Sequence, residues 1–170
     1  MTTQKFPKES LTILTNIVLP NETNALGNLF GGELLARMDR ACAIAAARHS
    51  ESSVVTASVN HVSFDIAIPL ASIVVIEAKV SRAFTSSMEV YVDVWIDNPI
   101  NKTKLKATEA IYTFVAVDAN NKPKAVPAIF PETELEQKRF EGALRRKQLS
   151  LILSNRMKPE DATELKKIFN

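Results

Sequence analysis

The chain has 170 residues, of which 46% are hydrophobic and 24% charged, and 21 Lys plus Arg against 19 Asp plus Glu give a formal net charge of +2. This length fits one globular domain, and so small a net charge does not predict nucleic-acid binding. No apolar run approaches the roughly 20 residues of a membrane-spanning helix. One cysteine and two histidines are too few for a disulfide framework or a structural zinc site.

The N-terminal part of the chain predicts one strand and then an irregular loop. The first eight residues resemble neither a secretory signal nor a transit peptide, which favours a cytoplasmic location. Residues 11–19 read as a strand, because apolar residues recur along them and Pro20, which lacks an amide donor, follows directly. The loop over residues 21–32 is rich in Asn, Thr and Gly, and it ends in a Gly-Gly pair.

A helix is expected over residues 33–49, directly after that pair. Its Leu, Met, Ala, Cys and Ile residues cover nearly every direction around the axis at 100° per residue. Such a helix is expected to be buried. The polar exceptions in its middle are Arg37, Asp39 and Arg40.

The remainder of the first 130 residues reads as β-structure. Runs rich in Val, Ile and Thr cover 54–64, 72–80, 88–96 and 105–117, with turn signals between them and no intervening helix. Without helical crossovers these strands are expected to pair antiparallel. The prediction is an α+β domain over residues 1–130, in which about five strands curl around one long central helix.

Residues 131–170 are expected to form a C-terminal helical extension. Glu, Lys, Arg and Leu dominate as far as Ser154, which indicates a charged helix, and a shorter helical piece is expected from Pro159 to Phe169. The simplest interpretation is a solvated helix packed on the domain or on a partner subunit.

Asp39 is the first candidate for chemistry. A carboxylate in an otherwise apolar helix costs several kcal/mol unless it is paired, hydrated or protonated. One interpretation is a salt bridge to Arg37, to Arg40 or to a residue from elsewhere in the chain. The other is a catalytic base.

Two features of the preceding loop favour catalysis. Gly31 and Gly32 present backbone amides without intrahelical partners at the positive end of the helix, where they can polarise a carbonyl oxygen as in an oxyanion hole. Asn24 supplies a side-chain amide that can donate to an oxygen and hold a water molecule. Together with Asp39, these groups supply a polariser, a water holder and a base, which are the roles that hydrolysis of an acyl group requires.

The spacing of these residues predicts an oligomer. Asp39 lies eight residues after Gly31, which is about 12 Å along a helix at 1.5 Å per residue. That is too far for one water molecule to touch both the base and a carbonyl held at the helix start. The interpretation therefore requires at least a homodimer, in which a two-fold partner brings its own Asp39 beside Asn24 and Gly31.

The helix-start sequence resembles a known family. The pattern NxxGxxFGGxLLxxMD, present from Asn24 to Asp39, resembles the acyl-CoA thioesterases of the hotdog fold, in the branch that includes small bacterial enzymes and the brain-type enzyme. The segment 85–90, TSSMEV, is similar to that branch's strand beside bound coenzyme A, although Phe84 stands where the family has a glycine. The likeness extends over about residues 11–127.

The resemblance implies hydrolysis of acyl-CoA thioesters to free fatty acid and coenzyme A, within fatty acid metabolism and with neither metal nor cofactor. It implies a double-hotdog dimer and commonly a trimer of dimers, that is, a homohexamer. Its catalytic roles fall on Asn24, Gly31, Gly32 and Asp39. Expected contacts to substrate or coenzyme A are the following residues: Thr56, Arg82, Thr85, Ser86, Ser87 and Met88. For Thr56 the alternation of its strand leaves open whether it lines the groove or lies on the outer sheet.

Two other classes of function remain as alternatives. A hotdog dehydratase or hydratase acting on acyl thioesters commonly pairs a histidine with a carboxylate, and the helix-start loop contains no histidine. His61, in a predicted strand, reads better as a hydrogen-bonded or surface residue. A non-catalytic acyl-CoA-binding protein is the third class, and it would bind without turnover.

Overall fold

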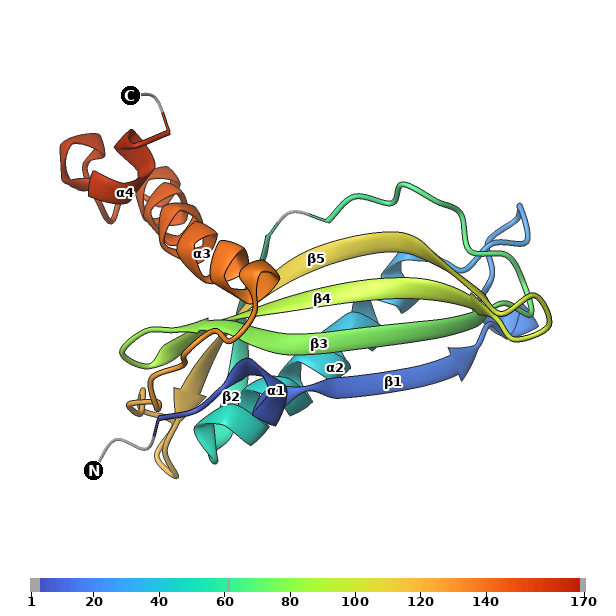
Figure 1. Cartoon of the computed structure of the whole chain (residues 1–170), viewed down its shortest axis with the longest axis horizontal. Helices are drawn as coiled ribbons and strands as arrows, with labels where there is room; N and C mark the ends of the chain where they lie inside the picture. The colour runs from blue at the N-terminus through green and yellow to red at the C-terminus, as the bar shows by residue number, and fades with distance from the viewer. Residues whose placement is uncertain (1–3, 61, 169–170) are drawn as a thin grey trace. The chain divides into compact units, whose positions relative to one another are not determined.

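The computed structural model describes residues 4–60 and 62–168, so His61 lies outside the described residues. The chain forms two compact units, Met1–Phe130 and Pro131–Asn170. In the first unit, a five-stranded sheet with the strand order β1-β3-β4-β5-β2 is antiparallel throughout (Figure 1). Its strands are β1 (Thr12–Ile17), β2 (Ser53–Asn60), β3 (Ile73–Ala83), β4 (Ser87–Asn98) and β5 (Thr103–Val117).

The sheet places β1 and β2 at its two edges. The long hairpins β3–β4 and β4–β5 form its middle, and β1 and β2, which come first in the chain, flank them. The register of β2 against β5 shifts between Thr56 and Ser58, so Ala57 is an extra residue on the edge strand. A bulge of this kind re-aims the neighbouring side chains.

The helix α2 (Gly31–Ser50) lies along one face of the sheet and contacts all five strands (Figure 1). The helix ends at a left-handed Glu51, whose amide donates to the carbonyl of Ala47. The predicted architecture of a sheet curled around one long helix is therefore confirmed.

The expectation that α2 is buried all round differs from the structure. One side is buried, with Leu34, Met38 and Ala41 among its residues, whereas Ile44 on the other side is 40% exposed. The reason is geometric, because a single curled sheet covers only one side of a helix. The apolar residues on the other side remain uncovered in the single chain.

The core of the first unit comes from alternating strand positions. Inward-facing residues of β3, β4 and β5 are essentially inaccessible, as period-two patterning requires. Tyr112 on β5 belongs to this core, and its hydroxyl donates to the carbonyl of Leu35 on α2 at 3.1 Å. Sheet and helix are thus joined by a polar contact as well as by apolar packing.

Two short helices of the first unit were not predicted. These are α1 (Pro7–Ser10) and the 3₁₀ helix η1 (Pro20–Glu22). Neither is long enough to produce a hydrophobic periodicity that a sequence can reveal.

The second unit is helical, with α3 (Glu134–Leu153), the 3₁₀ helix η2 (Pro159–Asp161) and α4 (Thr163–Lys166). A capping box begins α3, since the Thr133 hydroxyl accepts from the amide of Glu136 and the Glu136 carboxylate accepts from that of Thr133. Within the unit, the side-chain oxygen of Gln148 accepts from the amides of Glu164 and Leu165. This contact ties α4 to α3.

Candidate active site

Asp39 lies on the partly open side of α2, where it meets Thr56 of the edge strand β2. The Thr56 hydroxyl donates to Asp39 Oδ1 at 2.9 Å, directly before the bulge at Ala57. Ala36 and Ala43 flank the acid at positions i−3 and i+4 on the same face of α2. Asp39 itself is partly exposed.

The nearby arginines pair with other carboxylates. The Nη2 atom of Arg37 lies 2.6 Å from Glu22, and that of Arg40 lies 3.5 Å from Glu33. Within residues 4–60 and 62–168, no cation lies within ion-pair distance of Asp39. The salt-bridge interpretation of Asp39 is therefore not the arrangement that the chain adopts.

The N-terminus of α2 presents unpaired amides. The first intrahelical bond runs from the Leu34 amide to the Phe30 carbonyl at 3.1 Å, and the N-cap residue Phe30 makes no side-chain cap. In the described part of the chain, the amides of Gly31 and Gly32 have no protein acceptor. They point out at the positive end of a 20-residue helix, which is a suitable place for an oxygen that develops negative charge.

Phenyl rings lie beside both glycines at this end of the helix, and one of them is close enough to favour a residue without a side chain. A Cβ atom on Gly31 would lie 3.3 Å from the ring of Phe64, and one on Gly32 would lie 3.5 Å from the ring of Phe30. Neither glycine has a positive φ, so the need at Gly31 is clearance rather than backbone freedom, whereas a Cβ on Gly32 would make an ordinary van der Waals contact. The side chains of Phe30 and Phe64 are both exposed beside these amides. Phe64 carries no sequence signal of this role, because only the fold brings it to Gly31.

Asn24 organises the loop that precedes α2. Its Oδ1 accepts from the amides of Leu26 at 2.9 Å and Asn28 at 3.2 Å, which is an Asx turn closed by Gly27 in a left-handed conformation. The side-chain oxygen is therefore occupied by the turn. The Nδ2 group has no acceptor among the described residues, so it is the group that can donate to a ligand.

The chain carries two separate groups of candidate residues, which we call the amide half-site and the acid half-site. The amide half-site is Asn24, Gly31 and Gly32, and the acid half-site is Asp39 with Thr56. On the continuous helix, Gly31 and Asp39 are eight residues and about 12 Å apart, too far for one water molecule to bridge. The structure of one chain therefore does not bring the two half-sites together.

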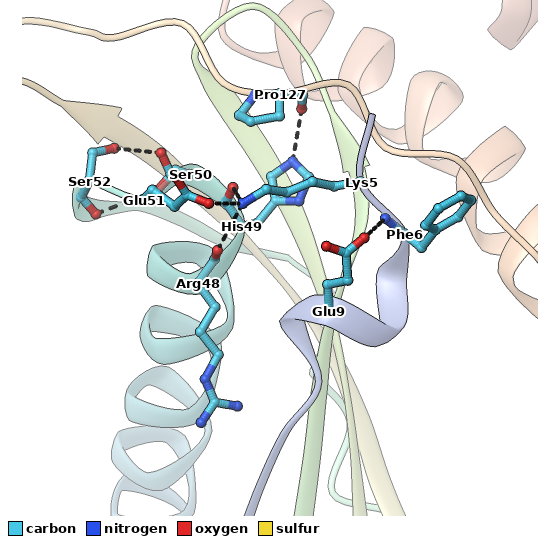
Figure 2. A network of polar contacts seen from close by, with 9 residues as sticks. All are labelled: Lys5, Phe6, Glu9, Arg48, His49, Ser50, Glu51, Ser52 and Pro127. Carbon is cyan, nitrogen blue, oxygen red and sulfur yellow. Dashed lines mark hydrogen bonds and ion pairs between the residues drawn. The ribbon is translucent and has the colours of Figure 1, made fainter. Parts of the chain in front are cut away.

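The predicted coenzyme A segment lies toward the C-terminal end of α2. The Thr85 carbonyl accepts from the Val126 amide at 3.0 Å, and the next residue, Pro127, accepts from His49 Nε2 near the end of α2 (Figure 2). Cross-strand register places Met88 on β4 in line with Phe114 on β5, and Phe114 in line with Thr56 on β2. The segment thus shares its end of the sheet with the acid half-site.

The members of this segment differ in access. Thr85 is exposed, and Ser86, Ser87 and Arg82 are partly exposed. The Arg82 guanidinium lies 5.6 Å from the ring centre of Phe84, the residue that replaces the family's glycine. Met88 is 0% exposed, so its side chain packs in the core. In this structure a ligand cannot reach it, which differs from the expected contact.

One buried ion pair near the amide half-site was not predicted. Arg37 is 4% exposed in the core side of α2, and its partner Glu22 belongs to η1. The sequence shows the i, i+4 spacing of Glu33 and Arg37, and those side chains do meet at 3.5 Å, but the shorter contact is to Glu22. That contact depends on how the loop folds back.

A search of the described residues for clusters of metal-ligating side chains found none, and none of their helices combines the length and hydropathy of a membrane span.

The comparisons with known proteins match this fold and these motifs. Residues 26–101 match the sequence model of the thioesterase superfamily. The uncharacterized acyl-CoA thioester hydrolase YkhA of Bacillus subtilis is 41% identical over 132 residues, which cover 78% of this chain and 77% of that protein. The cytosolic acyl coenzyme A thioester hydrolase of mouse is 34% identical over 134 residues, and the match spans 78% of this chain but only 35% of the mouse protein.

Solved structures agree with the sequence relatives. An acyl-CoA hydrolase from Staphylococcus aureus, solved with butyryl coenzyme A, coenzyme A and coenzyme A disulfide, has a TM-score of 0.85 and 37% identity, covering 90% of this chain and 95% of that one. A hexameric acyl-CoA thioesterase has a TM-score of 0.82 and 40% identity, covering 85% and 93%. The architecture is thus that of the hotdog-fold hydrolases. The chain belongs to the thioesterase superfamily, with the acyl-CoA thioester hydrolases among its relatives.

Proposed function

We propose that the protein hydrolyses acyl-CoA thioesters to a free fatty acid and coenzyme A, through Asp39 and the amides of Gly31 and Gly32. The observation that carries the proposal is that, among residues 4–60 and 62–168, Asp39 has no ion-pair partner and the amides of Gly31 and Gly32 have no acceptor. Family membership gives the substrate class. We extend the proposal to a cytosolic setting in fatty acid metabolism, which the name of the mouse relative supports.

In the proposed reaction, the thioester carbonyl oxygen accepts from the amides of Gly31 and Gly32. Asn24 Nδ2 holds a water molecule, or the carbonyl itself, and Asp39 Oδ2 takes a proton from that water as its oxygen attacks the carbonyl carbon. The oxyanion so formed collapses and breaks the carbon–sulfur bond. The proton held by Asp39 passes to the departing thiolate, so no external cofactor is consumed.

The Thr56 hydroxyl gives Asp39 a fixed orientation in this scheme, because it occupies Oδ1 and leaves Oδ2 for the proton. A direct attack by Asp39 on the carbonyl, with a mixed anhydride as intermediate, uses the same groups. Isotopic oxygen distinguishes the two routes. In a single turnover in H₂¹⁸O, general-base catalysis places the label only in the product acid, whereas the anhydride route places label in Asp39 when water attacks there.

Completion of the site requires a second chain, so we propose that a two-fold partner brings its acid half-site to the amide half-site. The surface around Asp39 supports this arrangement, since Ile44, Val55 and Val59 are exposed by 40%, 50% and 46% in the single chain. Apolar surface of this kind marks an interface. Because relatives of known structure are described as hexameric, we further propose a trimer of dimers.

For the coenzyme A moiety, we propose contacts from Arg82 and from the turn formed by Thr85, Ser86 and Ser87. These residues lie at the end of the sheet that carries the acid half-site. Arg82 supplies a cation for a phosphate, and the turn residues supply hydroxyl groups.

Structures of variants related to this chain support the assignment of residue types. The Staphylococcus aureus acyl-CoA hydrolase has been solved with a single aspartate, threonine or asparagine replaced by alanine, with TM-scores of 0.84, 0.85 and 0.86 to this chain and identities of 37%, 36% and 36%. These matches cover 89%, 90% and 91% of this chain, and 95%, 96% and 95% of the variant chains. Asp39, Thr56 and Asn24 are the residues of those types in the proposed site.

The test is release of free thiol from a panel of acyl-CoA substrates, short to long chain, by the wild type and by Asp39→Asn. The substitution removes the proton acceptor while keeping the shape, so kcat is expected to fall by roughly 100-fold or more. Asp161→Asn, an exposed position in the second unit, serves as the matched control and is expected to keep wild-type turnover. Full activity of Asp39→Asn would exclude Asp39 from the mechanism.

The same preparations separate the alternative classes. A hydratase would add water to an enoyl-CoA without releasing thiol, and a binding protein would retain acyl-CoA without turnover. His49 does not supply the histidine of a hydratase, because it lies near the opposite end of α2 from the amides and its Nε2 lies 2.8 Å from the Pro127 carbonyl.

A further inference from the structure

The buried ion pair between Arg37 and Glu22 is the feature that the proposed chemistry leaves unexplained. Arg37 is 4% exposed on the core side of α2, where an apolar side chain would avoid the cost of burying a charge. Its Nη2 lies 2.6 Å from Glu22 and its Nε lies 3.5 Å from Glu33, yet Nη1 is buried without any hydrogen-bond partner among the described residues. An arrangement with an unsatisfied donor is a costly way to fill this space.

Glu22 connects three parts of the chain around the amide half-site. One carboxylate oxygen accepts from Arg37, and the other accepts from the Leu19 amide at 2.7 Å after β1. The Glu22 carbonyl accepts from the Phe30 amide at 2.8 Å. The pKa of Glu22 is held below its usual value, first by the hydrogen bond from Arg37, so the Glu22 carboxylate is ionised near neutral pH.

These contacts control the two ends of the loop. Glu22 lies two residues before Asn24, and Phe30 lies directly before Gly31. The side chain of Phe30 makes no cap, and its backbone bond to Glu22 is one of the contacts that hold the start of α2 against the loop, beside the bridge between Thr23 and Leu29. Arg37 reaches this point from two turns further along the helix and fixes Glu22 to α2 itself.

We propose that the Glu22–Arg37 ion pair is a positioning device for the hydrolytic site, which holds the Nδ2 group of Asn24 at a fixed place relative to the amides of Gly31 and Gly32. The inference rests on the proposed function. A water molecule held by Asn24 and a carbonyl held by the amides must approach within about 3.5 Å to react, and errors near 1 Å are costly. The ion pair fixes that distance and contacts no substrate.

The chain provides a matched control at the other end of the same helix. Lys5 is 9% exposed, and its Nζ lies 2.5 Å from Glu51 and 3.0 Å from the His49 carbonyl (Figure 2). This second pair also joins α2 to a distant part of the chain, and it lies away from the amide half-site. Its removal reports what the loss of an anchoring ion pair does to the fold alone.

The experiment compares the double variant Glu22→Gln/Arg37→Met with the control Lys5→Met/Glu51→Gln by thermal unfolding and acyl-CoA hydrolysis. Removing both charges leaves no uncompensated buried ion, so Glu22→Gln/Arg37→Met is expected to unfold at or above the temperature of the single variant Glu22→Gln. Its kcat is expected to fall at least 10-fold, with KM within about 3-fold of wild type. The control is expected to keep kcat within about 2-fold, whatever its stability.

A folded double variant with wild-type kcat would overturn the positioning role. A fall in kcat that is equally large in the control would also overturn it, because the effect would then follow from weaker anchoring of α2 in general. If the double variant does not fold, Arg37→Lys takes its place, since it keeps the charge and loses the fork that reaches two carboxylates. Thiol release by the wild type is measured before any variant is compared. Its absence would overturn the proposed function rather than the positioning role.

Discussion

Asn24 has a structural role and a proposed catalytic one, and replacing a single group of its side chain can separate the two. Its Oδ1 closes the loop by accepting from two backbone amides, and its Nδ2 is the donor assigned to water or carbonyl. Asn24→Asp keeps an acceptor for the turn and removes the donor. Asn24→Ala removes both groups.

The two variants are therefore expected to differ in stability but not in catalysis. Asn24→Ala is expected to lose about 1 kcal/mol of unfolding free energy through the lost turn, and Asn24→Asp is expected to stay within about 0.5 kcal/mol of the wild type. Both are expected to lower kcat at least 10-fold. Urea unfolding and thiol release measure the two effects, and wild-type turnover in Asn24→Asp would show that the side chain only builds the turn.

Single residues also show where sequence reasoning reached its limit. Asp39 was detectable because an acid stands out among apolar neighbours on a helix, a pattern that needs no tertiary information. The salt bridge considered for it with Arg37 was wrong, because Arg37 pairs with Glu22 across a folded loop. Thr56 could not be assigned to a face from alternation alone, since both faces of the edge strand β2 are largely exposed and a bulge follows Thr56.

At the scale of elements, α2 has an open start and a closed end. Its first amides have no acceptor in the part of the chain that the structure describes, whereas Lys5 Nζ donates to the carbonyls of Arg48 and His49 at its C-terminus (Figure 2). A cation at this end also complements the helix dipole. Helix α2 is thus stabilised at its C-terminal end, where we propose no chemistry. Its N-terminal amides, where we propose that the carbonyl binds, are left without a protein acceptor among the described residues.

His49 makes the closed end sensitive to acid. Burial lowers the pKa of His49 from 6.5, and the nearby Lys5 cation acts in the same direction, while the carbonyl of Pro127 and the carboxylates of Glu9 and Glu51 oppose the shift. The folded chain therefore binds this proton less readily than the unfolded chain. Stability is expected to be complete above about pH 7 and to fall as the pH drops below 6.5.

His49→Gln tests this dependence, because a glutamine amide can still donate to Pro127 but does not titrate. Between pH 7.5 and about 5, the urea midpoint of the wild type is expected to fall more than that of the variant. Glu22 and Glu51 do not interfere, since their pKa values lie below 4.5 and their contribution is lost only in stronger acid. Parallel pH profiles for the two proteins would contradict the assignment.

The elements themselves were predictable where they are long and regular. The strands after residue 70 and the central helix follow from periods of two and of 3.6 residues, and they differ from the structure by only a few residues at their ends. The strand predicted over 54–64 is shorter in the structure, where β2 ends at Asn60 and Phe64 lies beside Gly31. The position of β2 at the far edge beside β5 follows from tertiary pairing, for which local patterns give no signal.

At the scale of the whole molecule, the single chain displays two candidate half-sites, which it does not bring together, and an exposed apolar surface around Asp39. The amide half-site is at the start of α2, and the acid half-site is about 12 Å further along. In a two-fold dimer every site takes its amides from one chain and its acid from the other. Activity then depends on how chains combine, which a mixture of variants can measure.

Equal co-expression of Asn24→Asp and Asp39→Asn is expected to restore about a quarter of wild-type activity, although each variant alone is nearly inactive. A site is intact only when its amide half-site comes from an Asp39→Asn chain and its acid half-site from an Asn24→Asp chain, and each choice has a probability of about one half. The same reasoning holds for a dimer or a trimer of dimers.

Equal mixing of the wild type with the double variant Asn24→Asp/Asp39→Asn is likewise expected to leave about a quarter of wild-type activity. If each chain held a complete site, the first mixture would remain inactive and the second would keep about half, so the two mixtures together decide whether the site is shared.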